Sequence, residues 1–442
     1  MALSHLPGCV GSFFVDLAHW LDKRSAARVP VLLLGMLLAS GRRTVTSWFK
    51  ATDLWEDWRQ GYVTVYACGR NVKHMAITVV HQVKPVLDPK RLLLGIDDTP
   101  TGRYGPFVEG AGIHHNPTPG PAGEKHVYGH VWVILSALGQ HPDWGTIALP
   151  LQAQLYIRAT DIDKLPPERK RPFRTKLELA VEQLRWLLPR VDGDFLERWV
   201  AADGAYAKRP FLLPARKAGW VVVSRLRKDA ALWDLPPTQR RPGQRGPMPT
   251  YGKKRISLAK RAGQTRGWEQ VECVQYGQSV TKTIKTFQAT YRPAGGMIRV
   301  VLLKEEDGWI PYFCTNPNAT AAEVLEAAAD RGAVEQMHRD VKEVWGAGEQ
   351  QVRNVYSNEG CFNLNLWMHT LVETWAWDKS EDELIDRRKS PWDREPRRPS
   401  HADKRRALQR QVLRAEIEEA LAGRPTKQRI RELAERLLAL AA

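Results

Sequence analysis

Charged side chains with a spacing suited to metal and phosphate chemistry recur between Asp330 and Arg353. If this segment is one helix, residues at steps of three and four share a face. The residues on one such face are Arg331, Glu335, Arg339 and Lys342. A carboxylate among three cations can hold metal ions and phosphates. The same spacing is equally typical of an exposed helix with ordinary salt bridges, so the helix alone leaves both interpretations open.

Two short apolar runs upstream each end in aspartate. The run from Leu92 ends at Asp97 and Asp98, and the run from Trp199 ends at Asp203. Such runs are typical of buried strands that carry carboxylates at their exposed ends. Carboxylate oxygens are the ligands that Mg²⁺ and Mn²⁺ prefer. Three acids from two strand ends and one helix could therefore hold two ions and act on a phosphodiester.

The composition favours a polyanionic partner. The chain has 442 residues, a formal net charge of +17 and 43% hydrophobic residues, which indicates a globular, strongly basic protein of two or three domains. The longest apolar run, residues 29–39, is shorter than the roughly 18 residues that span a bilayer, so we expect no membrane partner. The expected partner is double-stranded DNA.

The cysteines and the first residues favour the cytoplasm. The five cysteines are scattered and include no CxxC pair, so a disulfide framework or a structural zinc site is not expected. The start of the chain has no basic region followed by a signal-like apolar core. Four histidines (His114, His115, His126 and His130) lack nearby cysteines, and we interpret them as polar residues of a loop and a strand.

The order of expected elements predicts a mixed α/β fold in five regions. Residues 1–85 are expected to be helical, either as a DNA-binding head or as a cap on the main domain. Residues 86–225 and 306–378 would form the two parts of a catalytic core, with a helix over Asn358–Ala376. Residues 226–305 would be a basic, β-rich insertion. Residues 379–442 would comprise a charged, mobile linker and two amphipathic helices.

Further basic side chains are candidates for DNA contacts. The insertion carries the run Lys253, Lys254 and Arg255, which is either a DNA-facing strip or a solvated loop. Because the net charge is so high, we favour contact with DNA, and we extend this expectation to Arg339 and Arg353.

The segment from Tyr312 to Asn354 resembles the third catalytic block of bacterial insertion-sequence transposases of the DDE superfamily. That block has the pattern Tyr, two residues, Arg, three residues, Glu, six residues, Lys, and Arg331, Glu335 and Lys342 match its spacings. The stretches LLLGIDDT and VAADGAYAKRPF resemble the first two blocks. The long basic insertion is similar to that of the hairpin-forming, cut-and-paste branch.

This resemblance implies a ribonuclease H-like core that uses two Mg²⁺ ions, with Mn²⁺ as a substitute. Carried over by position, Asp97, Asp203 and Glu335 would be the catalytic metal ligands, with Asp98 as the alternative to Asp97. Arg331 and Lys342 would contact phosphates at the cut end.

The resemblance also implies what the protein does with DNA. It would cut a transposon end, and the freed 3′-hydroxyl would attack the opposite strand to make a hairpin and later attack target DNA. In that branch a tryptophan of the insertion stacks on a flipped base; Trp309 or Trp233 could serve this role, with a purely structural role as the favoured alternative for each. The assembly of paired ends implies a homodimer, formed through the C-terminal helices.

Two positions depart from the family pattern. The tyrosine position is occupied by Ala328, and the aromatic residue that commonly follows the arginine is replaced by Gly332. These departures keep two alternatives open: a decayed transposase that acts as a DNA-binding repressor, and a metal-dependent nuclease without strand transfer.

Overall fold

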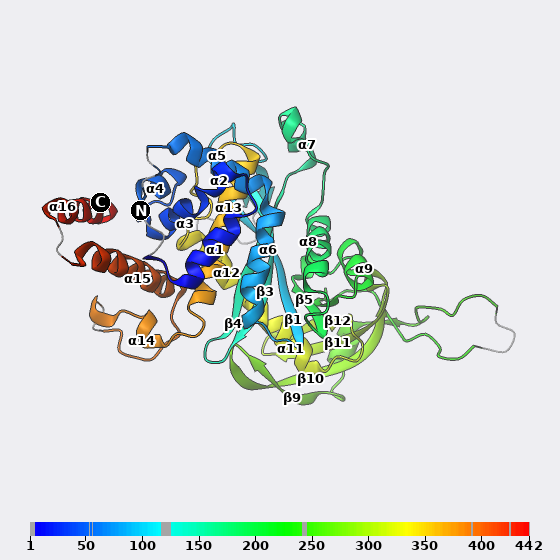
Figure 1. Ribbon diagram of the computed structural model, residues 1–442. Coiled ribbons are helices and arrows are strands. Elements are labelled where there is room, and N and C mark those ends of the chain that lie inside the picture. The colour runs from blue at the N-terminus through cyan, green and yellow to red at the C-terminus, as the bar shows by residue number, and fades with distance from the viewer. Residues whose placement is uncertain are drawn as a thin grey trace.

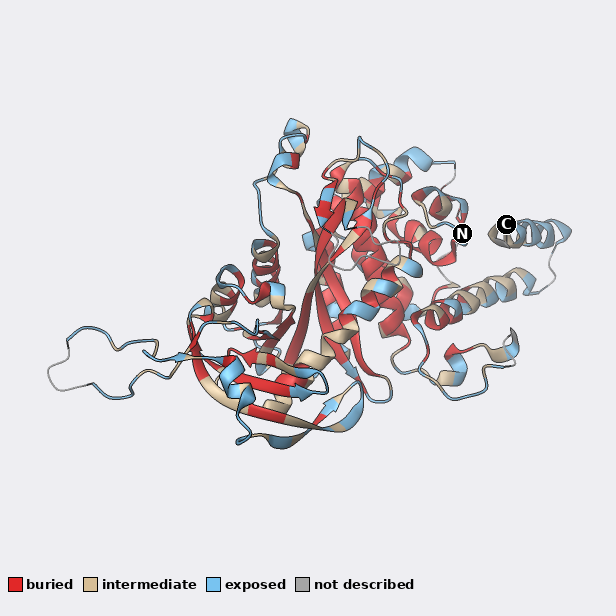
Figure 2. Ribbon diagram, turned by 180° about the vertical axis from the view of Figure 1, so that it is seen from behind, coloured by how far each residue is buried: buried red, intermediate tan, exposed pale blue. Residues whose placement is uncertain are grey.

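A computed structural model describes residues 5–52, 54, 56–115, 125–240, 245–389, 392–423 and 426–441. Helices at both ends of the chain flank a large sheet, and the central strands are buried between helices (Figures 1 and 2). In the described residues no helix combines the length and the apolar character needed to cross a membrane. The expected mixed α/β fold with helical ends is confirmed.

The helices at the start of the chain pack on the core. They are α1 (Gly8–Ala18), α2 (Lys23–Ala26), α3 (Val29–Leu38), α4 (Val45–Lys50), α5 (Trp58–Arg70) and α6 (Val72–Val83). Helix α5 lies against α13 (Val355–Trp375), and a Cβ added at Gly69 would collide with the Tyr356 carbonyl. Helix α3 is almost completely buried. The packing is therefore that of a cap joined to the main domain.

In the described residues the strands form one continuous sheet. The strands are β1 (Arg91–Gly102), β2 (Gly112–His115), β3 (His126–His141), β4 (Gly145–Tyr156), β5 (Glu197–Ala202), β6 (Val221–Arg225), β7 (Leu232–Trp233), β8 (Arg255–Ile256), β9 (Glu269–Gln275), β10 (Gln278–Tyr291), β11 (Gly296–Glu305) and β12 (Gly308–Cys314). At its centre β4, β3 and β1 are antiparallel neighbours, while β1, β5 and β6 run parallel. This arrangement is the ribonuclease H-like core.

The β-rich insertion extends this sheet. Strand β12 pairs with β6 on one side and with β11 on the other, and β11 continues through β10 to β7 and β9. Between β7 and β8, residues 234–240 and 245–254 run out from the sheet as an arm (Figure 1). Backbone pairing therefore makes the insertion and the core one sheet.

Helices cover the two faces of the core strands (Figure 1). Helix α8 (Lys176–Val191) lies against β3, and α9 (Arg209–Lys217) lies against β6. On the other face, α12 (Gly332–Glu343) contacts β1 and β4, and α13 contacts β4. The remaining α-helices are α7 (Ala159–Ile162), α10 (Leu258–Gly263), α11 (Ala321–Asp330), α14 (Glu381–Leu384), α15 (His401–Leu421) and α16 (Lys427–Ala441).

The single helix expected from Asp330 to Arg353 is wrong. Helix α11 ends at Asp330, α12 runs from Gly332 to Glu343, and the chain is not helical again until α13 begins at Val355. The charged face nevertheless survives from Arg331 to Lys342. The glycines at 346 and 348 both have positive φ, a conformation that ends a helix readily.

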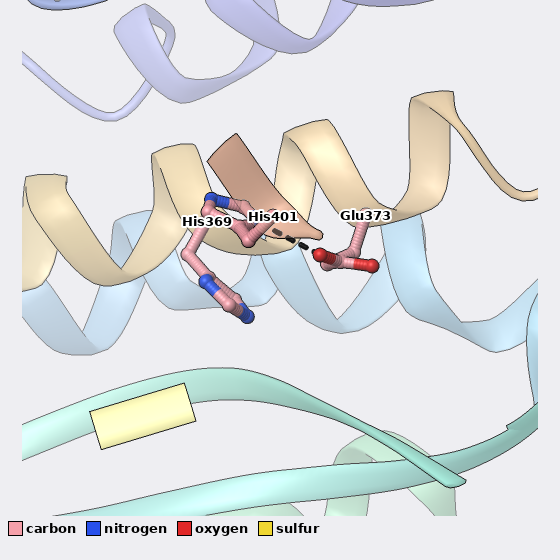
Figure 3. A group of neighbouring side chains, drawn as sticks. All are labelled: His369, Glu373 and His401. Carbon is pink, nitrogen blue, oxygen red and sulfur yellow. Dashed lines mark hydrogen bonds and ion pairs between the residues drawn. The ribbon is translucent and has the colours of Figure 1, made fainter. Parts of the chain in front are cut away.

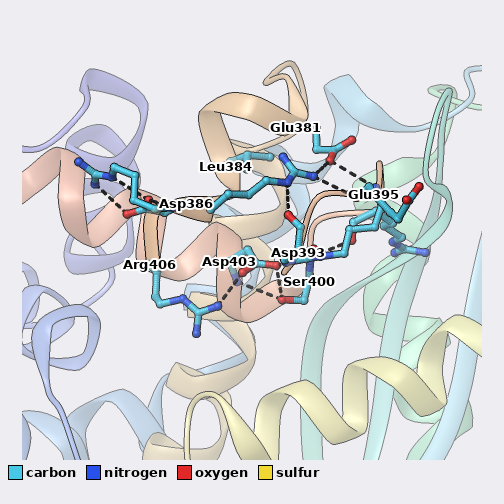
Figure 4. Close-up of polar contacts among 12 residues, drawn as sticks. Glu381, Leu384, Asp386, Asp393, Glu395, Ser400, Asp403 and Arg406 are labelled. Carbon is cyan, nitrogen blue, oxygen red and sulfur yellow. Dashed lines mark hydrogen bonds and ion pairs between the residues drawn. The ribbon is translucent and has the colours of Figure 1, made fainter. Parts of the chain in front are cut away.

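The charged segment after α13 is held by ion pairs, although its composition predicts a mobile linker. Arg397 contacts Asp393 at 2.8 Å and Asp403 at 2.7 Å, and Arg388 contacts Asp386 at 2.8 Å (Figure 4). Ser400 and Asp403 form a capping box that starts α15. These contacts hold the described part of the segment in place where it leads into α15.

Candidate functional site

Two of the candidate acids lie at the same end of the parallel pairing of β1 with β5. The parallel pairing of β1 with β5 ends at Ile96 and Ala202, and Asp97 and Asp203 are the next residues of the two strands. Contrary to expectation, Asp97 does not end its strand, because β1 continues to Gly102 while paired with β3. Asp97 thus lies where the parallel pairing stops.

Helix α12 approaches this edge closely. The Gly95 position has no side chain, and a Cβ there would lie 2.5 Å from Cγ2 of Val334. Residues two apart on a strand share a face, so Asp97 lies on the same face as Gly95, toward α12. A glycine two residues before the acid therefore makes room for the helix that carries Glu335.

Arg331 joins the acids of the strand and the helix. Its Nη1 donates to Oδ2 of Asp97 at 2.9 Å, and its Nη2 donates to Oε1 of Glu335 at 2.9 Å. Arg331 sits at the junction of α11 and α12, and Glu335 follows one turn later with its side chain 66% exposed. The charged face expected for this helix is thus organised around one guanidinium, which bridges two carboxylates.

The acids repel one another. The pKa of Asp97 is raised to about 6, mainly by burial and further by the charges of Asp98 and Asp203, while Arg331 opposes the rise. Burial, together with all three aspartates, also raises the pKa of Tyr206. Such a cluster favours a bound cation, and its oxygen-only donors fit Mg²⁺. The residues present are therefore chemically suited to the implied ions.

Asp98 has different partners. Its Oδ2 accepts from Nζ of Lys176 at 2.6 Å, and its Oδ1 accepts from the hydroxyl of Tyr206 at 3.2 Å. Lys176 begins α8, on the face away from α12. The geometry brings Asp97, rather than Asp98, to the guanidinium shared with Glu335.

The other basic candidates on α12 and beyond it differ in setting. Nζ of Lys342 donates to Oγ1 of Thr99 at 2.6 Å, and burial lowers the pKa of this lysine. Arg339 is exposed on the same helix. Arg353 lies beyond the helix and lines a groove together with Lys342.

The candidates of the insertion lie away from this cluster in sequence and in the sheet. Lys253, Lys254 and Arg255 are exposed at the base of the arm, where the backbone of Lys254 pairs with Asp234. Trp309 on β12 lies under the ammonium of Lys228 at 5.2 Å from the ring centroid. The ring of Trp233 faces Arg292 at 4.9 Å.

The four histidines occupy β2 and β3, and His130 has polar partners. Nδ1 of His130 accepts from Arg103 at 3.2 Å, and burial lowers the pKa of His130 to about 3. His115 and His126 pair across the strands with ring centroids 6.1 Å apart. In the described residues they form no group with metal-ligand spacing.

A buried cluster that the sequence reasoning missed joins α13 to α15. Ligand atoms of His369, Glu373 and His401 lie within 4.8 Å of one another, which no other set of three does in the described chain (Figure 3). By the same criterion, the carboxylate oxygens of Asp97, Asp203 and Glu335 do not all lie within 4.8 Å of one another. The step of four from His369 to Glu373 on an expected helix was the signal available in the sequence.

Glu373 and His401 of this cluster already have polar partners, whereas Nδ1 of His369 is buried without one. Glu373 accepts from His401 at 2.6 Å and from Nζ of Lys404 at 2.5 Å, and Nε2 of His401 accepts from Trp345 at 2.7 Å. These charges lower the pKa of Glu373 well below its ordinary value despite burial, which by itself would raise it. With an ammonium in contact, the cluster is an internal ion-pair network and does not fit a divalent metal.

A second missed residue, Tyr276, lies beside the start of α12. It forms the turn between β9 and β10, and its Cε1 lies 3.3 Å from where a Cβ of Gly332 would be. Tyr276 is 76% exposed and is the one non-glycine residue with positive φ in the described chain, at 54°. The Tyr-Gly pair within a β-branched stretch was the signal for this turn.

Comparison with known proteins gives one match. The sequence model of a family described as DDE superfamily endonuclease matches residues 16–292, which include Asp97, Asp203 and much of the insertion. No curated protein sequence shows significant similarity to the chain. The family match ends before Glu335, so that residue is placed beside Asp97 by geometry alone.

Proposed function

Because the chain belongs to the DDE superfamily of endonucleases, we propose that it is a transposase that cuts transposon ends and joins them to target DNA. The family membership itself gives the coarser activity, metal-dependent cleavage of DNA. The observation that carries the finer assignment of residues is the Arg331 guanidinium shared by Asp97 and Glu335.

Asp97, Asp203 and Glu335 would hold two Mg²⁺ ions, which Mn²⁺ can replace. When bound, the ions activate the attacking oxygen and stabilise the leaving oxygen of the phosphodiester. The raised pKa of Asp97 is consistent with this assignment, because a carboxylate that is mainly buried and also lies near Asp98 and Asp203 gains from a bound cation. Asp98 would position the strand through Lys176 and Tyr206 instead of binding metal.

Arg331 and Lys342 would hold the phosphates of the cut end. Arg331 pairs with Asp97 and Glu335, and its guanidinium would be available to a phosphate oxygen once those acids hold a cation. Arg339 and Arg353 extend the positive charge beyond the site. Lys253, Lys254 and Arg255 would contact DNA at the insertion, with Trp309 as the stacking aromatic residue.

The reaction would proceed in two stages on double-stranded DNA of the cytoplasm. Hydrolysis would free a 3′-hydroxyl at the transposon end, and that hydroxyl would attack the opposite strand to form a hairpin. After hairpin opening it would attack target DNA. Paired ends require two active sites, so the working form would be a homodimer joined through the C-terminal helices.

The test is cleavage, with Mg²⁺, of a labelled duplex that carries inverted repeats from the genomic flanks. We expect the native protein to cut, and Asp97→Asn and Glu335→Gln to lose at least about a hundred-fold in rate. The matched control is Glu343→Gln, an exposed acid at the end of the same helix, which should cut at the native rate. Asp98→Asn should retain more activity than Asp97→Asn.

The products separate the alternatives. A hairpin or joined DNA supports the transposase, whereas simple cuts indicate a nuclease without strand transfer. Tight binding without any cutting indicates a repressor. Equal cutting by native protein and Glu335→Gln would overturn the assigned site.

A further inference from the structure

An aromatic loop lies next to the candidate site, between β1 and β2. Tyr104 and Phe107 are 97% and 77% exposed on this loop, and Ile113 on β2 is exposed beside it. Scattered exposed apolar side chains are ordinary, but two aromatic rings three residues apart on one short loop are not. The sequence pattern gave these rings no role.

The start of the loop is held firmly. The Arg103 guanidinium is buried and donates to Nδ1 of His130 at 3.2 Å, to Oδ1 of Asn358 at 2.9 Å and to the carbonyl of Gly348. The hydroxyl of Tyr128 donates to the carbonyl of Gly105 at 3.1 Å. These contacts fix the backbone on both sides of Tyr104.

The end of the loop is held by Glu109. Its backbone N–H donates to the carbonyl of Arg353 at 2.9 Å, and its Oε2 accepts from the N–H of Val355 at 2.9 Å. Nε of Arg169 lies 3.0 Å from the same oxygen. Both ends of the loop are therefore anchored, so the rings between them are held out in water by a fixed backbone.

The loop divides two hollows of similar size. One, of about 730 Å³, is lined by Tyr104 and by the cations Arg42, Lys342 and Arg353. The other, of about 750 Å³, is lined by Tyr104 and Phe107 with Arg158. Cationic walls attract phosphates, and exposed rings offer faces on which bases stack.

The first hollow is linked to the strand that carries Asp97 through Lys342. Lys342, which lines it, donates to Thr99, and Thr99 is two residues beyond Asp97 on the same strand. Tyr104 follows Asp97 by seven residues, so it lies within roughly 25 Å of that acid, the span of seven extended residues. A DNA strand lying in this hollow would thus run from the neighbourhood of Asp97 toward the ring of Tyr104.

We propose that the loop from Arg103 to Ala111 is a wedge that stacks Tyr104 and Phe107 on bases of DNA opened next to the cut. The phosphates of the opened strand lie along Arg42, Lys342 and Arg353. This inference rests on the proposed action on DNA and adds a preference for DNA that is partly unpaired. An unpaired base stacks without the cost of opening a duplex, so forked DNA binds more tightly than paired DNA.

Fluorescence anisotropy with Ca²⁺, which is used here to support binding without cutting, provides the test. The probes are a labelled 30-base-pair duplex and a fork in which half of the same sequence is unpaired. We expect native protein to bind the fork about ten-fold more tightly than the duplex. Tyr104→Ala/Phe107→Ala should lose this preference while keeping its affinity for the duplex, and Tyr104→Phe/Phe107→Tyr should restore it.

Two controls isolate the rings. Trp392→Ala removes an equally exposed ring that lines neither hollow and should leave the preference unchanged. Arg353→Gln, which removes a phosphate contact and leaves both rings in place, should weaken binding to the fork. Circular dichroism and thermal melting check that each variant is folded.

Three other outcomes of the binding experiment overturn the wedge. Native protein without a preference for the fork contradicts it, as does a double alanine variant that keeps the preference. A retained preference with a changed oligomeric state would assign the loop to a protein contact. Failure to cut in Mg²⁺, with the fork preference intact, would overturn the nuclease assignment and leave the wedge standing.

Discussion

At the scale of single residues, Arg331 and Tyr276 meet at one point from distant parts of the chain. Arg331 holds Asp97 and Glu335, and the next residue, Gly332, leaves space for the ring of Tyr276. A tyrosine with positive φ carries backbone strain that glycine or asparagine would avoid. Such strain is found at functional sites, and here it lies next to the start of the helix that carries Glu335.

Tyr276→Asn should make the protein more stable and slower in cutting. Both central residues of this two-residue turn have positive φ (54° and 78°), as in type I′ turns, where asparagine is favoured at the first of them. We expect a gain of about 1 kcal/mol in the free energy of unfolding, measured by urea denaturation. Tyr276→Phe keeps the strained backbone and should show no gain. A loss of stability in the asparagine variant would contradict the strain argument.

At the scale of elements, polar contacts between distant segments decide how helices sit. On α13, Asn363 donates to and accepts from the backbone of Ala153, Trp367 donates to Leu151, and Thr370 donates to Pro150. These side chains satisfy backbone groups of β4, whose only strand partner in the sheet of the described residues is β3. Helix α13 therefore replaces a strand at that edge.

The start of α15 is stabilised by polar contacts of Asp403, and this stabilisation varies with pH. Burial alone would raise the pKa of Asp403, but donors on Arg397, Ser400 and Arg406 lower it to about 2, against 3.8 without these contacts. The carboxylate therefore stabilises the fold above about pH 4, and this contribution is lost as the pH falls toward 2.

Asp403→Asn should cost about 1–2 kcal/mol at pH 7, because one pKa unit corresponds to about 1.4 kcal/mol. Thermal unfolding at several pH values should show the gap to native protein narrowing below about pH 4. Asp382→Asn, an exposed acid in the same segment, should cost little at any pH. A gap that stays constant down to the lowest measurable pH would contradict the linkage.

At the scale of the whole molecule, the two ends of the chain close on each other. The buried guanidinium of Arg405 on α15 donates to the carbonyls of Leu37 and Ala39 at the end of α3, at 3.0 and 2.8 Å. Those carbonyls have no partner within their own helix. The N- and C-terminal helices are thus one packed unit beside the sheet, and the arm with its basic base lies on the other side (Figure 1).

Binding to DNA should weaken steeply with salt. The net charge of +17 predicts contacts with many phosphates, and each contact contributes about 0.9 to the slope of log affinity against log salt concentration. Removing Lys253, Lys254 and Arg255 together should lower that slope by about 2–3. Arg185, Arg209 and Lys217 are exposed cations on α8 and α9, away from the arm. Replacing these three removes the same charge and should change the slope little. Equal slopes for native protein and the first variant would exclude the arm base from the DNA contact.

The sequence by itself determined the helical ends, the strands of the core and the charged face of α12. Each of these follows from local periodicity, and Arg331, Glu335 and Lys342 were named from spacing alone. The candidate acids were also named from the short apolar runs that precede them, because such runs predict buried strands.

Only the tertiary structure decided which side chains meet. The parallel register of β1 and β5 brings Asp97 level with Asp203. The close approach of α12 at Gly95 shows that Asp97, and not Asp98, is on the face of the strand toward that helix. Partners more than twenty residues away, or glycine φ angles, account for three further features. These are the break at Arg331, the network around Glu373 and the burial of polar residues on α13. Local sequence carries no information on such pairings, because their free energy exists only once the segments are packed together.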